Sequence, residues 1–448
     1  QMPLPMSGSD GADAPCEKAT TKKSARAASA AEGCPAHDGA QEVGQAALAE
    51  GDELSRSAAL AAIVKQNPHC AQLLAPAAEP FLDDAIRSGR QFCEDNRYLS
   101  KDLPRMKYKK RADSDRSSCH WGQLKLLESE MKCLLEIVTD NSSSPPALGS
   151  HLVVYAGAAP GAHVLSLLRR FPSCTFELYD PASFDQQLVD FAATAEGRGR
   201  VTLVNDFFND ELAQKIAARR RPSIFFSDIR TADPTQMEFA EVEGYVERDM
   251  LKQKDWAKIL RPQLSVLKFR LPWGPGTTLY LRGKILVQAF PPCTSTETRL
   301  LVPLAALDEP EVAYDQEAYE EQLMYHNTVS RACIYDHSVE VPGLDHCYDC
   351  AALAHTVRRL LQLRHLLGGG AAEGGAAEGE ALAAEVRALV EEVGKSKRSL
   401  ESRYHVSSSR HGGRQFAKRR YYDSEGKDRF TEEPPRKRAP NKHRYFED

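Results

Sequence analysis

Short apolar runs in the middle of the chain alternate with stretches whose apolar residues recur at helical spacing. The runs lie at residues 152–155, 175–179, 201–204, 223–226 and 264–271, and such runs are typical of strands buried on both faces. Helices are expected at 121–138, 164–168 and 237–260, a hairpin at 278–290 and a last strand at 298–304. This order predicts an α/β fold with a mostly parallel sheet, antiparallel edge strands and flanking helices.

The first apolar run ends in a glycine-bearing turn. Gly157, Pro160 and Gly161 break the strand, and a helix is expected directly after them. Asp180 closes the next run, about 20 residues on, where a carboxylate can bind ribose hydroxyls. The glycine spacing is not the GxGxxG of a nicotinamide site. Strand, turn, helix and Asp180 together predict a pocket for an adenosyl ligand.

Composition divides the chain into four parts. Residues 1–85 are rich in small residues and poor in aromatic ones, which predicts a disordered or weakly helical extension. Residues 86–365 carry the α/β pattern. A Gly/Ala/Glu linker is expected at 366–380. A tail is expected at 381–448, which begins with a short helix at 382–393 and carries basic clusters from 395 on.

Charge and hydropathy limit the partners. The formal net charge is -5, but Lys and Arg gather in the tail, which predicts a nuclear-import signal, contact with RNA, or both, with a merely solvated tail as the alternative. No apolar run approaches the ~20 residues of a membrane span, so no membrane partner is expected. One CxxC with nearby histidines favours ordinary helix residues over a metal site; its members are His346, Cys347, Cys350 and His355.

Four ionisable residues are candidates for chemistry: Lys125, Asp228, Lys268 and Glu297. Lys268 interrupts an otherwise apolar run, so it is not a routine surface lysine. A lysine acts as a base near neutral pH when its pKa is lowered, and a second ammonium group nearby lowers it. The grouping suits methyl transfer to a hydroxyl group, and a salt-bridge network in an α/β core is the alternative interpretation.

Six short segments match, in order, one known family. They are GQLKLL at 122–127, YAGAAPGAH at 155–163, VTLV at 201–204, SDIR at 227–230, LK at 267–268 with Pro272, and TETRLL at 296–301. Through them the chain resembles the poxvirus-type cap-specific mRNA (nucleoside-2′-O-)-methyltransferases, which also serve as the small subunit of viral poly(A) polymerase. Kinetoplastid cap ribose methyltransferases belong to the same group. The resemblance spans about residues 108–362 and implies a Rossmann-like methyltransferase fold that uses S-adenosylmethionine.

The resemblance also implies roles at the matching positions. Lys125, Asp228, Lys268 and Glu297 would be the family's catalytic tetrad, with Lys268 as the base. The methylated guanine of the RNA cap would stack between Trp273 and Tyr108, with Glu320 accepting hydrogen bonds from its edge, because aromatic faces attract a cationic ring. Pro275 and Ala182 stand where the family has an acidic residue and an arginine. The implied cofactor contacts are Gln123, Tyr155, Gly157, Pro160, Gly161, Asp180, Asp206, Phe208, Asp228 and Ile229.

We therefore expect a cap ribose 2′-O-methyltransferase that acts on an early transcribed nucleotide, with the second or a later one favoured by the long extensions. Its substrate would be mRNA or a spliced-leader-type RNA bearing 7-methylguanosine, and capping or polyadenylation machinery would be a partner. A general RNA 2′-O-methyltransferase and a non-catalytic RNA-binding subunit are the alternatives. The basic tail predicts location in the nucleus, or in the cytoplasm for a viral protein.

Overall fold

The computed structural model describes residues 60–61, 80, 90–108, 122–138, 150–232, 237–291, 294–337, 339, 346–368, 376–393, 421–422 and 428–429. The extension expected at 1–85 and the basic tail beyond 393 therefore lie almost entirely outside the described residues. In the tail, β12 (Tyr421–Tyr422) and β13 (Asp428–Arg429) form a short antiparallel pair.

A seven-stranded sheet forms the centre of the fold, in the order β4-β3-β2-β5-β6-β9-β8. Neighbours among the first five are parallel, whereas β9 runs antiparallel to both β6 and β8. The expected mostly parallel sheet with antiparallel edge strands is confirmed. The strands are β2 (Leu152–Ala156), β3 (Thr175–Tyr179), β4 (Val201–Val204), β5 (Ser223–Ser227), β6 (Leu264–Phe269), β8 (Lys284–Leu286) and β9 (Thr298–Pro303).

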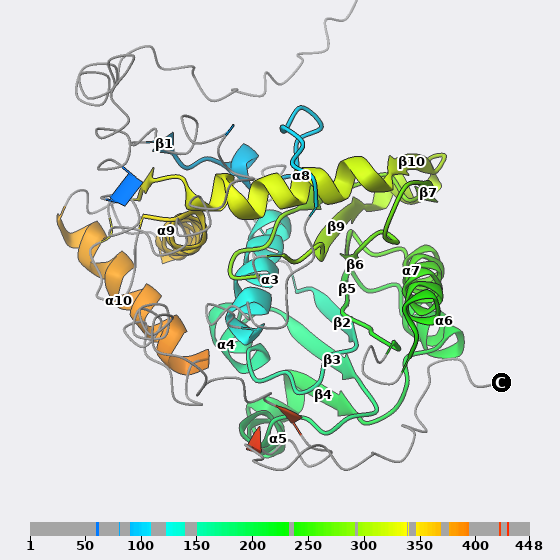
Figure 1. The fold of residues 1–448 in the computed structure, drawn as a ribbon. Coiled ribbons are helices and arrows are strands. Elements are labelled where there is room, and N and C mark those ends of the chain that lie inside the picture. The colour runs from blue at the N-terminus through cyan, green and yellow to red at the C-terminus, as the bar shows by residue number, and fades with distance from the viewer. Residues whose placement is uncertain are drawn as a thin grey trace, which may run out of the picture. The chain divides into compact units, whose positions relative to one another are not determined.

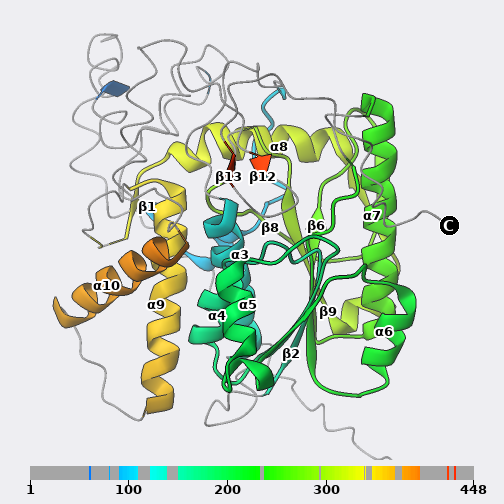
Figure 2. The ribbon, with the colours of Figure 1, turned by 90° about the horizontal axis from the view of Figure 1, so that it is seen from below.

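Helices cover both faces of this sheet, as Figures 1 and 2 show. On one face lie α6 (Asp210–Ala217) and α7 (Phe239–Leu260), and on the other α3 (Gly122–Val138), α4 (Val164–Arg170) and α5 (Gln186–Ala193). The central strands β2 and β5 are buried along their whole length, which is why they read as unbroken apolar runs. No helix among the described residues combines the length and hydropathy that a membrane crossing requires.

The expected hairpin at 278–290 does not form. Its first strand, β7 (Thr277–Tyr280), pairs instead with β10 (Val312–Asp315). Its second strand, β8, joins β9 in the central sheet, where Leu286 is fully buried. The two strands are adjacent in the sequence but belong to different sheets, because β8 buries Leu286 by pairing with β9. A further short pair joins β1 (Arg90–Gln91) to β11 (Tyr335–Asp336).

The segment expected as a linker, 366–380, is helical at both ends. Helix α9 (Tyr348–Gly368) extends into it, and α10 (Ala376–Val393) begins within it. An apolar stripe of α10 packs against α3, α4 and α9, with Leu382, Val386 and Leu389 buried. Arg170 on α4 also binds two α10 carboxylates, at 2.8 Å and 2.7 Å. Residues 376–393 therefore belong to the fold rather than to the tail.

The order of the strands places a switch point between β2 and β5. From β2 the chain proceeds to β3 and β4 on one side, whereas β5 and β6 lie on the other. In such sheets, ligands bind in the crevice at the carboxyl ends of the strands at this point. Asp180, Asp228 and the glycine turn all follow these ends.

Candidate active site

The turn after β2 packs backbone to backbone on the turn after β5. Gly157 has φ +79°, and a Cβ there would lie 2.7 Å from the Ile229 nitrogen and 2.8 Å from the Asp228 carbonyl carbon. Gly161 also has a positive φ, +64°. Only glycine combines this conformation with so close an approach. The two turns thus border the switch point without a side chain between them.

We expect Gly157→Ala to lower the free energy of unfolding by about 1–3 kcal/mol, because an L-residue is strained at this φ and the added methyl group overlaps backbone atoms. The same change should weaken cofactor binding. Urea denaturation and equilibrium binding measure the two effects. Gly199→Ala is the matched control, because a Cβ at Gly199 meets nothing within 4 Å. Unchanged stability and binding in Gly157→Ala would contradict this interpretation of the turn.

Asp180 ties the glycine turn to the end of β3. Its Oδ2 accepts a hydrogen bond from the Ala159 amide at 3.0 Å, and its Oδ1 accepts one from the Ala182 amide at 2.8 Å. Burial raises the pKa of Asp180. Each carboxylate oxygen keeps a further lone pair, so the side chain can still accept from ribose hydroxyls. At Ala182, where the resemblance implies an arginine, only the backbone amide binds Asp180 and no cationic side chain is present.

Two of the predicted cofactor contacts belong to a buried network that the sequence did not reveal. The Tyr155 hydroxyl donates to Glu130 at 2.7 Å, and this ring is only 2% exposed. Gln123 Oε1 accepts from the His163 amide at 3.2 Å and lies 2.8 Å from Nδ1 of the same residue. The His163 Nε2 lies 2.9 Å from Glu130. The Tyr155 side chain therefore points into the core, while His163 holds the Gln123 amide in place.

The remaining predicted cofactor residues are divided between surface and core. Asp206 is exposed beyond β4, and its carboxylate accepts from the Phe207 amide at 2.7 Å. Phe208 and Ile229 are each 1% exposed. The Phe208 ring lies edge-on to Tyr179, with centroids 5.1 Å apart. The Pro160 carbonyl accepts from the Asp185 amide at 2.8 Å, which joins the glycine turn to the start of α5.

The four candidate catalytic residues come together at the carboxyl end of the sheet. Lys125 projects from α3, Asp228 follows β5, Lys268 lies on β6 and Glu297 precedes β9. Lys125 Nζ donates to Glu297 Oε1 at 2.6 Å. Lys268 Nζ lies 2.9 Å from Asp228 Oδ1 and 3.5 Å from Glu297 Oε2. Each lysine thus has a carboxylate partner, and Glu297 bridges the two.

Two arginines complete this cluster, and the sequence analysis assigned neither a role. Arg299 lies opposite Lys268 in the β6–β9 register, is 3% exposed, and binds Asp228 at 2.7 Å. Arg230 binds Glu297 Oε2, the oxygen that faces Lys268. A signal for Arg299 was present, because it interrupts an apolar strand as Lys268 does. Arg230 follows Asp228 by two residues in a turn, where the sequence pattern does not predict which way a side chain points.

The electrostatics of the cluster favour ionised acids and a more easily deprotonated Lys268. Burial lowers the pKa of Lys268, and Arg230 lowers it further, against the two carboxylates. Burial would raise the pKa of Asp228, but Arg299 and Lys268 together hold it well below its usual range. Burial would likewise raise the pKa of Glu297, but the charges of Lys125 and Lys268 hold it well below its usual range. We expected a second ammonium group to lower the pKa of Lys268, but burial and the Arg230 guanidinium group are the main causes that lower it.

The three residues expected to bind the cap also lie together. The Tyr108 and Trp273 rings have centroids 4.3 Å apart and planes at 69°. Glu320 on α8 (Gln316–Thr328) accepts from the amide of Gly274, which follows Trp273, at 3.0 Å. Burial raises the pKa of Glu320. Because the two rings are in edge contact, a base can stack between them only after they separate.

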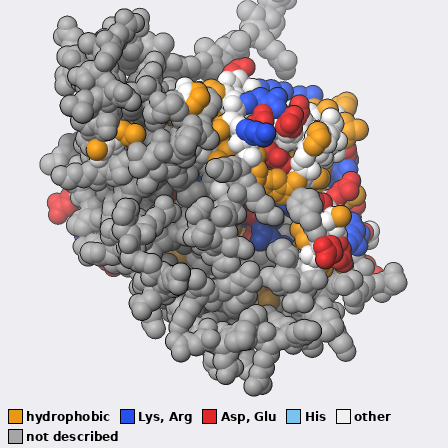
Figure 3. Space-filling model, viewed as in Figure 1, with side chains coloured by type: hydrophobic (Ala, Val, Ile, Leu, Met, Phe, Trp, Pro, Cys, Tyr) orange, Lys and Arg blue, Asp and Glu red, His pale blue; other side chains and the backbone are white. Residues whose placement is uncertain are grey.

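Paired charges cover the neighbouring surface. Figure 3 shows Lys and Arg interspersed with Asp and Glu over the described surface near α8, β7 and β10. Arg105 lies 3.5 Å from Glu317 on α8, and Arg282 lies 2.8 Å from Glu309. Mixed charge of this kind does not create the one-sign field that attracts a phosphate backbone over a distance.

The CxxC grouping does not form a metal site. Within the described residues, no group of three or more His, Cys, Asp or Glu is placed to hold a metal ion. Cys347 and Cys350 are both fully buried. His346 stacks on His337, with centroids 4.7 Å apart, and its Nδ1 lies 3.1 Å from the Tyr335 carbonyl.

Several known proteins resemble this chain. A family model described as "Poly A polymerase regulatory subunit" matches residues 98–351. The cap-specific mRNA (nucleoside-2′-O-)-methyltransferase of Myxoma virus (strain Lausanne) is 27% identical over 252 residues, which cover 51% of this chain and 68% of the viral protein. The corresponding Fowlpox virus (strain NVSL) protein is 26% identical over 226 residues, covering 47% and 68%.

Among solved structures, bluetongue virus VP4, described as a multifunctional RNA-capping production-line, matches with a TM-score of 0.32 and 11% identity. The match covers 57% of this chain and 43% of VP4, so the chain spans less than half of that protein. The family model, by contrast, spans more than half of the 448 residues. The chain belongs to the poly A polymerase regulatory subunit family.

Proposed function

We propose that this protein transfers a methyl group from S-adenosylmethionine to the 2′-hydroxyl of an early nucleotide in 7-methylguanosine-capped RNA. The observation that supports this most is the cluster of Lys268, Asp228 and Glu297 beside the glycine turn at the switch point. The viral relatives named above as cap-specific 2′-O-methyltransferases support the same activity. On this proposal the methylated nucleotide is the second or a later one.

The residues at the switch point suit the proposed cofactor. Gly157 leaves the crevice open, and Asp180 offers carboxylate lone pairs for ribose hydroxyls. Gln123, held by His163 just after the glycine turn, offers a further polar group. When bound, S-adenosylmethionine supplies an electrophilic methyl group on a sulfonium.

The chain itself has to orient the acceptor and remove its proton. Lys268 Nζ, in its neutral form, takes the proton of the 2′-hydroxyl as the oxygen forms its bond to the methyl carbon and the carbon–sulfur bond breaks. Asp228 and Glu297 hold Nζ in position, and Lys125 and Arg299 balance their charge. Such a network costs little reorganisation at the moment of reaction because its members are already paired.

A second candidate function rests on the family description as a regulatory subunit of poly A polymerase. A non-catalytic RNA-binding subunit would need no base at position 268, whereas a general RNA 2′-O-methyltransferase would need no cap pocket. The adjacency of Tyr108, Trp273 and Glu320 favours the cap enzyme over the general one. The role of the basic tail in nuclear import or RNA contact stays a prediction, because the tail lies almost wholly outside the described residues.

Methyl transfer from labelled S-adenosylmethionine to two RNAs of one sequence tests the proposal. One RNA carries 7-methylguanosine and the other a 5′-triphosphate, and the labelled nucleotide is mapped afterwards. We expect label only in the capped RNA, on an early ribose. Equal labelling of both would favour the general methyltransferase, and tight RNA binding without labelling would favour the regulatory subunit.

Trp273→Ala should raise the KM for capped RNA about 5- to 150-fold, because stacking on one aromatic side chain is worth about 1–3 kcal/mol. The KM for S-adenosylmethionine should stay unchanged, since Trp273 lies on the α8 side of the site, next to Tyr108. Steady-state kinetics with each substrate varied in turn gives both values. A parallel rise in the two KM values would contradict the cap assignment.

The single-turnover rate should rise with pH and level off below the ordinary lysine pKa of 10.5. The sign follows from the mechanism: only neutral Lys268 accepts a proton, and burial and Arg230 lower its pKa, so the neutral form is populated at lower pH than in a free lysine. Arg230→Met should move this profile to higher pH. A rate that is independent of pH would argue against Lys268 as the base.

A further inference from the structure

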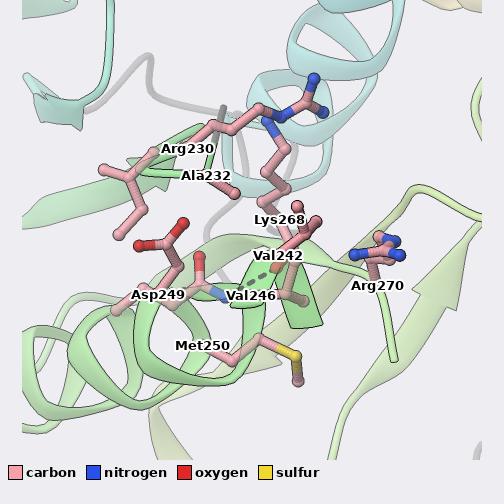
Figure 4. Close-up of a pocket in the computed structure, with 10 residues that line it drawn as sticks. Arg230, Ala232, Val242, Val246, Asp249, Met250, Lys268 and Arg270 are labelled. Atoms are coloured by element: carbon pink, nitrogen blue, oxygen red, sulfur yellow. Dashed lines mark hydrogen bonds between the residues drawn. The ribbon is translucent and has the colours of Figure 1, made fainter. Parts of the chain in front are cut away.

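A pocket of about 260 Å³ lies beside Lys268, between α7 and β6. Arg270, two residues after Lys268, lines this pocket on the side opposite Asp249, as Figure 4 shows. Its guanidinium group donates to Glu243 of α7 at 2.5 Å. Both members of this ion pair are partly buried, with 19% of the Arg270 side chain and 14% of the Glu243 side chain exposed. The mechanism above gives the pair no role.

The Glu243 carboxylate also binds the segment that carries Trp273. Its Oε2 accepts a hydrogen bond from the Trp273 amide at 3.1 Å. The next amide along the chain, that of Gly274, donates to Glu320 Oε1 on α8 at 3.0 Å. Two carboxylates, one from α7 and one from α8, thus bind consecutive amides. The backbone position of Trp273 is therefore set from both helices.

The cation of the pair lies close to the indole ring. The Arg270 guanidinium carbon is 5.5 Å from the centroid of the Trp273 ring, within the range of about 6 Å for a cation–π contact. A base stacked on this ring at about 3.5 Å is no more than about 9 Å from the same charge, whichever face it uses. An unpaired guanidinium group there would repel a cationic base, and Glu243 compensates its charge.

Three charged groups thus act on a base at Trp273. Glu243 and Glu320 are acidic and Arg270 is basic, so together they carry net negative charge. Burial raises the pKa of Glu320, while Arg270 lowers it and Glu243 raises it, so each of the three groups is within electrostatic reach of the others. The 7-methylguanine base is cationic and unmethylated guanine is neutral. Net negative charge at this place therefore favours the methylated base.

We propose that Glu243 is a positioning residue that makes the cap site selective for methylated over unmethylated guanine. It fixes the backbone of Trp273, and it neutralises Arg270, which would otherwise repel the cationic base. Glu243 acts through these two residues and does not touch the base itself. This inference rests on the proposed function, because that function places 7-methylguanine at Trp273.

Equilibrium binding of two cap dinucleotides tests the proposal. One carries 7-methylguanine and the other unmethylated guanine, and the selectivity is the Kd of the unmethylated form divided by that of the methylated form. Glu243→Gln keeps an oxygen that can accept from the Trp273 amide but removes the charge. We expect it to lower the selectivity about 2- to 20-fold, the effect of one unit charge about 9 Å away at effective dielectric constants of about 80 to 20. Weaker binding of both dinucleotides by the same factor would indicate a merely structural role and overturn the proposal.

Arg270→Met tests the same electrostatic effect independently. Removal of the cation should raise the selectivity of the otherwise unchanged protein, and in the Glu243→Gln background it should restore the wild-type value. A folded Arg270→Met protein with unchanged selectivity would overturn the proposal, even if Glu243→Gln does not fold. Glu247→Gln is the matched control, because it removes the same charge from an exposed position one turn further along α7. A loss of selectivity as large in Glu247→Gln as in Glu243→Gln would also overturn it.

Methyl transfer to capped RNA separates this proposal from the one on which it rests. A preference for the methylated dinucleotide that Glu243→Gln lowers, without any methyl transfer by the wild-type protein, would refute the proposed function and leave the role of Glu243 standing. Methyl transfer only to capped RNA, with a selectivity that neither Glu243→Gln nor Arg270→Met changes, would support the proposed function and overturn the role of Glu243.

Discussion

Replacing Lys268 by alanine should lower the single-turnover rate of methyl transfer by about 10²–10⁴-fold, the usual contribution of a positioned general base. The methyl donor remains bound in this variant, but no neutral amine stands within reach of the acceptor hydroxyl. Lys125 cannot replace it, because its Nζ is committed to Glu297 at 2.6 Å. A quench-flow measurement with capped RNA and saturating S-adenosylmethionine reports the chemical step directly.

The substitution should leave the fold intact. Asp228 and Glu297 retain Arg299, Arg230 and Lys125 as counter-charges after Lys268 is lost. Cofactor affinity, which depends on the turn around Gly157 on the other side of β5, should stay near the wild-type value. Lys258→Ala on α7 is the matched control, because its side chain is 44% exposed and pairs with Glu311, which is outside the cluster. Full activity in a folded Lys268→Ala protein would remove Lys268 from the role of base.

Strand order explains how far the sequence alone could predict this site. Parallel strands end at one edge, so residues that follow β3 and β5 had to lie near each other once the apolar runs were identified. In the antiparallel part the register of β6 and β9 positions the residues. Phe269 pairs with Thr298, which brings Glu297 near Lys268. The placement of Lys125 depends instead on how α3 packs, which the order of the strands does not determine.

What the sequence could not predict arises from tertiary contacts between distant segments. The Glu130–His163 contact joins a helix to a turn, and neither residue stands out from its neighbours. The short helix predicted at 382–393 is confirmed, but the Gly/Ala/Glu-rich residues before it hid that α10 begins at Ala376. Leu382, Val386 and Leu389 form its buried stripe at helical spacing. The pocket beside Lys268 is a property of the gap between α7 and β6, for which the sequence carries no pattern.

Arg97→Met should lower the free energy of unfolding by about 3–5 kcal/mol, as expected when one partner of a buried ion pair is removed. Arg97 and Glu128 are both fully buried, with Nη1 and Oε1 2.7 Å apart. Thr356 on α9 joins them, donating to Glu128 at 2.7 Å and accepting from Arg97 at 2.9 Å. Without the guanidinium group, the Glu128 carboxylate has no cation inside the core. Urea denaturation followed by circular dichroism measures the loss.

A double variant distinguishes the destabilisation caused by an unpaired Glu128 carboxylate from the stability that the Arg97–Glu128 ion pair itself contributes. Arg97→Met with Glu128→Leu removes both charges and should recover most of the lost stability, because apolar replacements of a buried pair are often neutral or stabilising. Arg105→Met is the surface control and should change stability little, since Arg105 is 45% exposed. A double variant as unstable as Arg97→Met would show that the pair itself holds α3 against α9. The position of Lys125 and Gln123, both on α3, would then depend on a contact far from the carboxyl edge of the sheet.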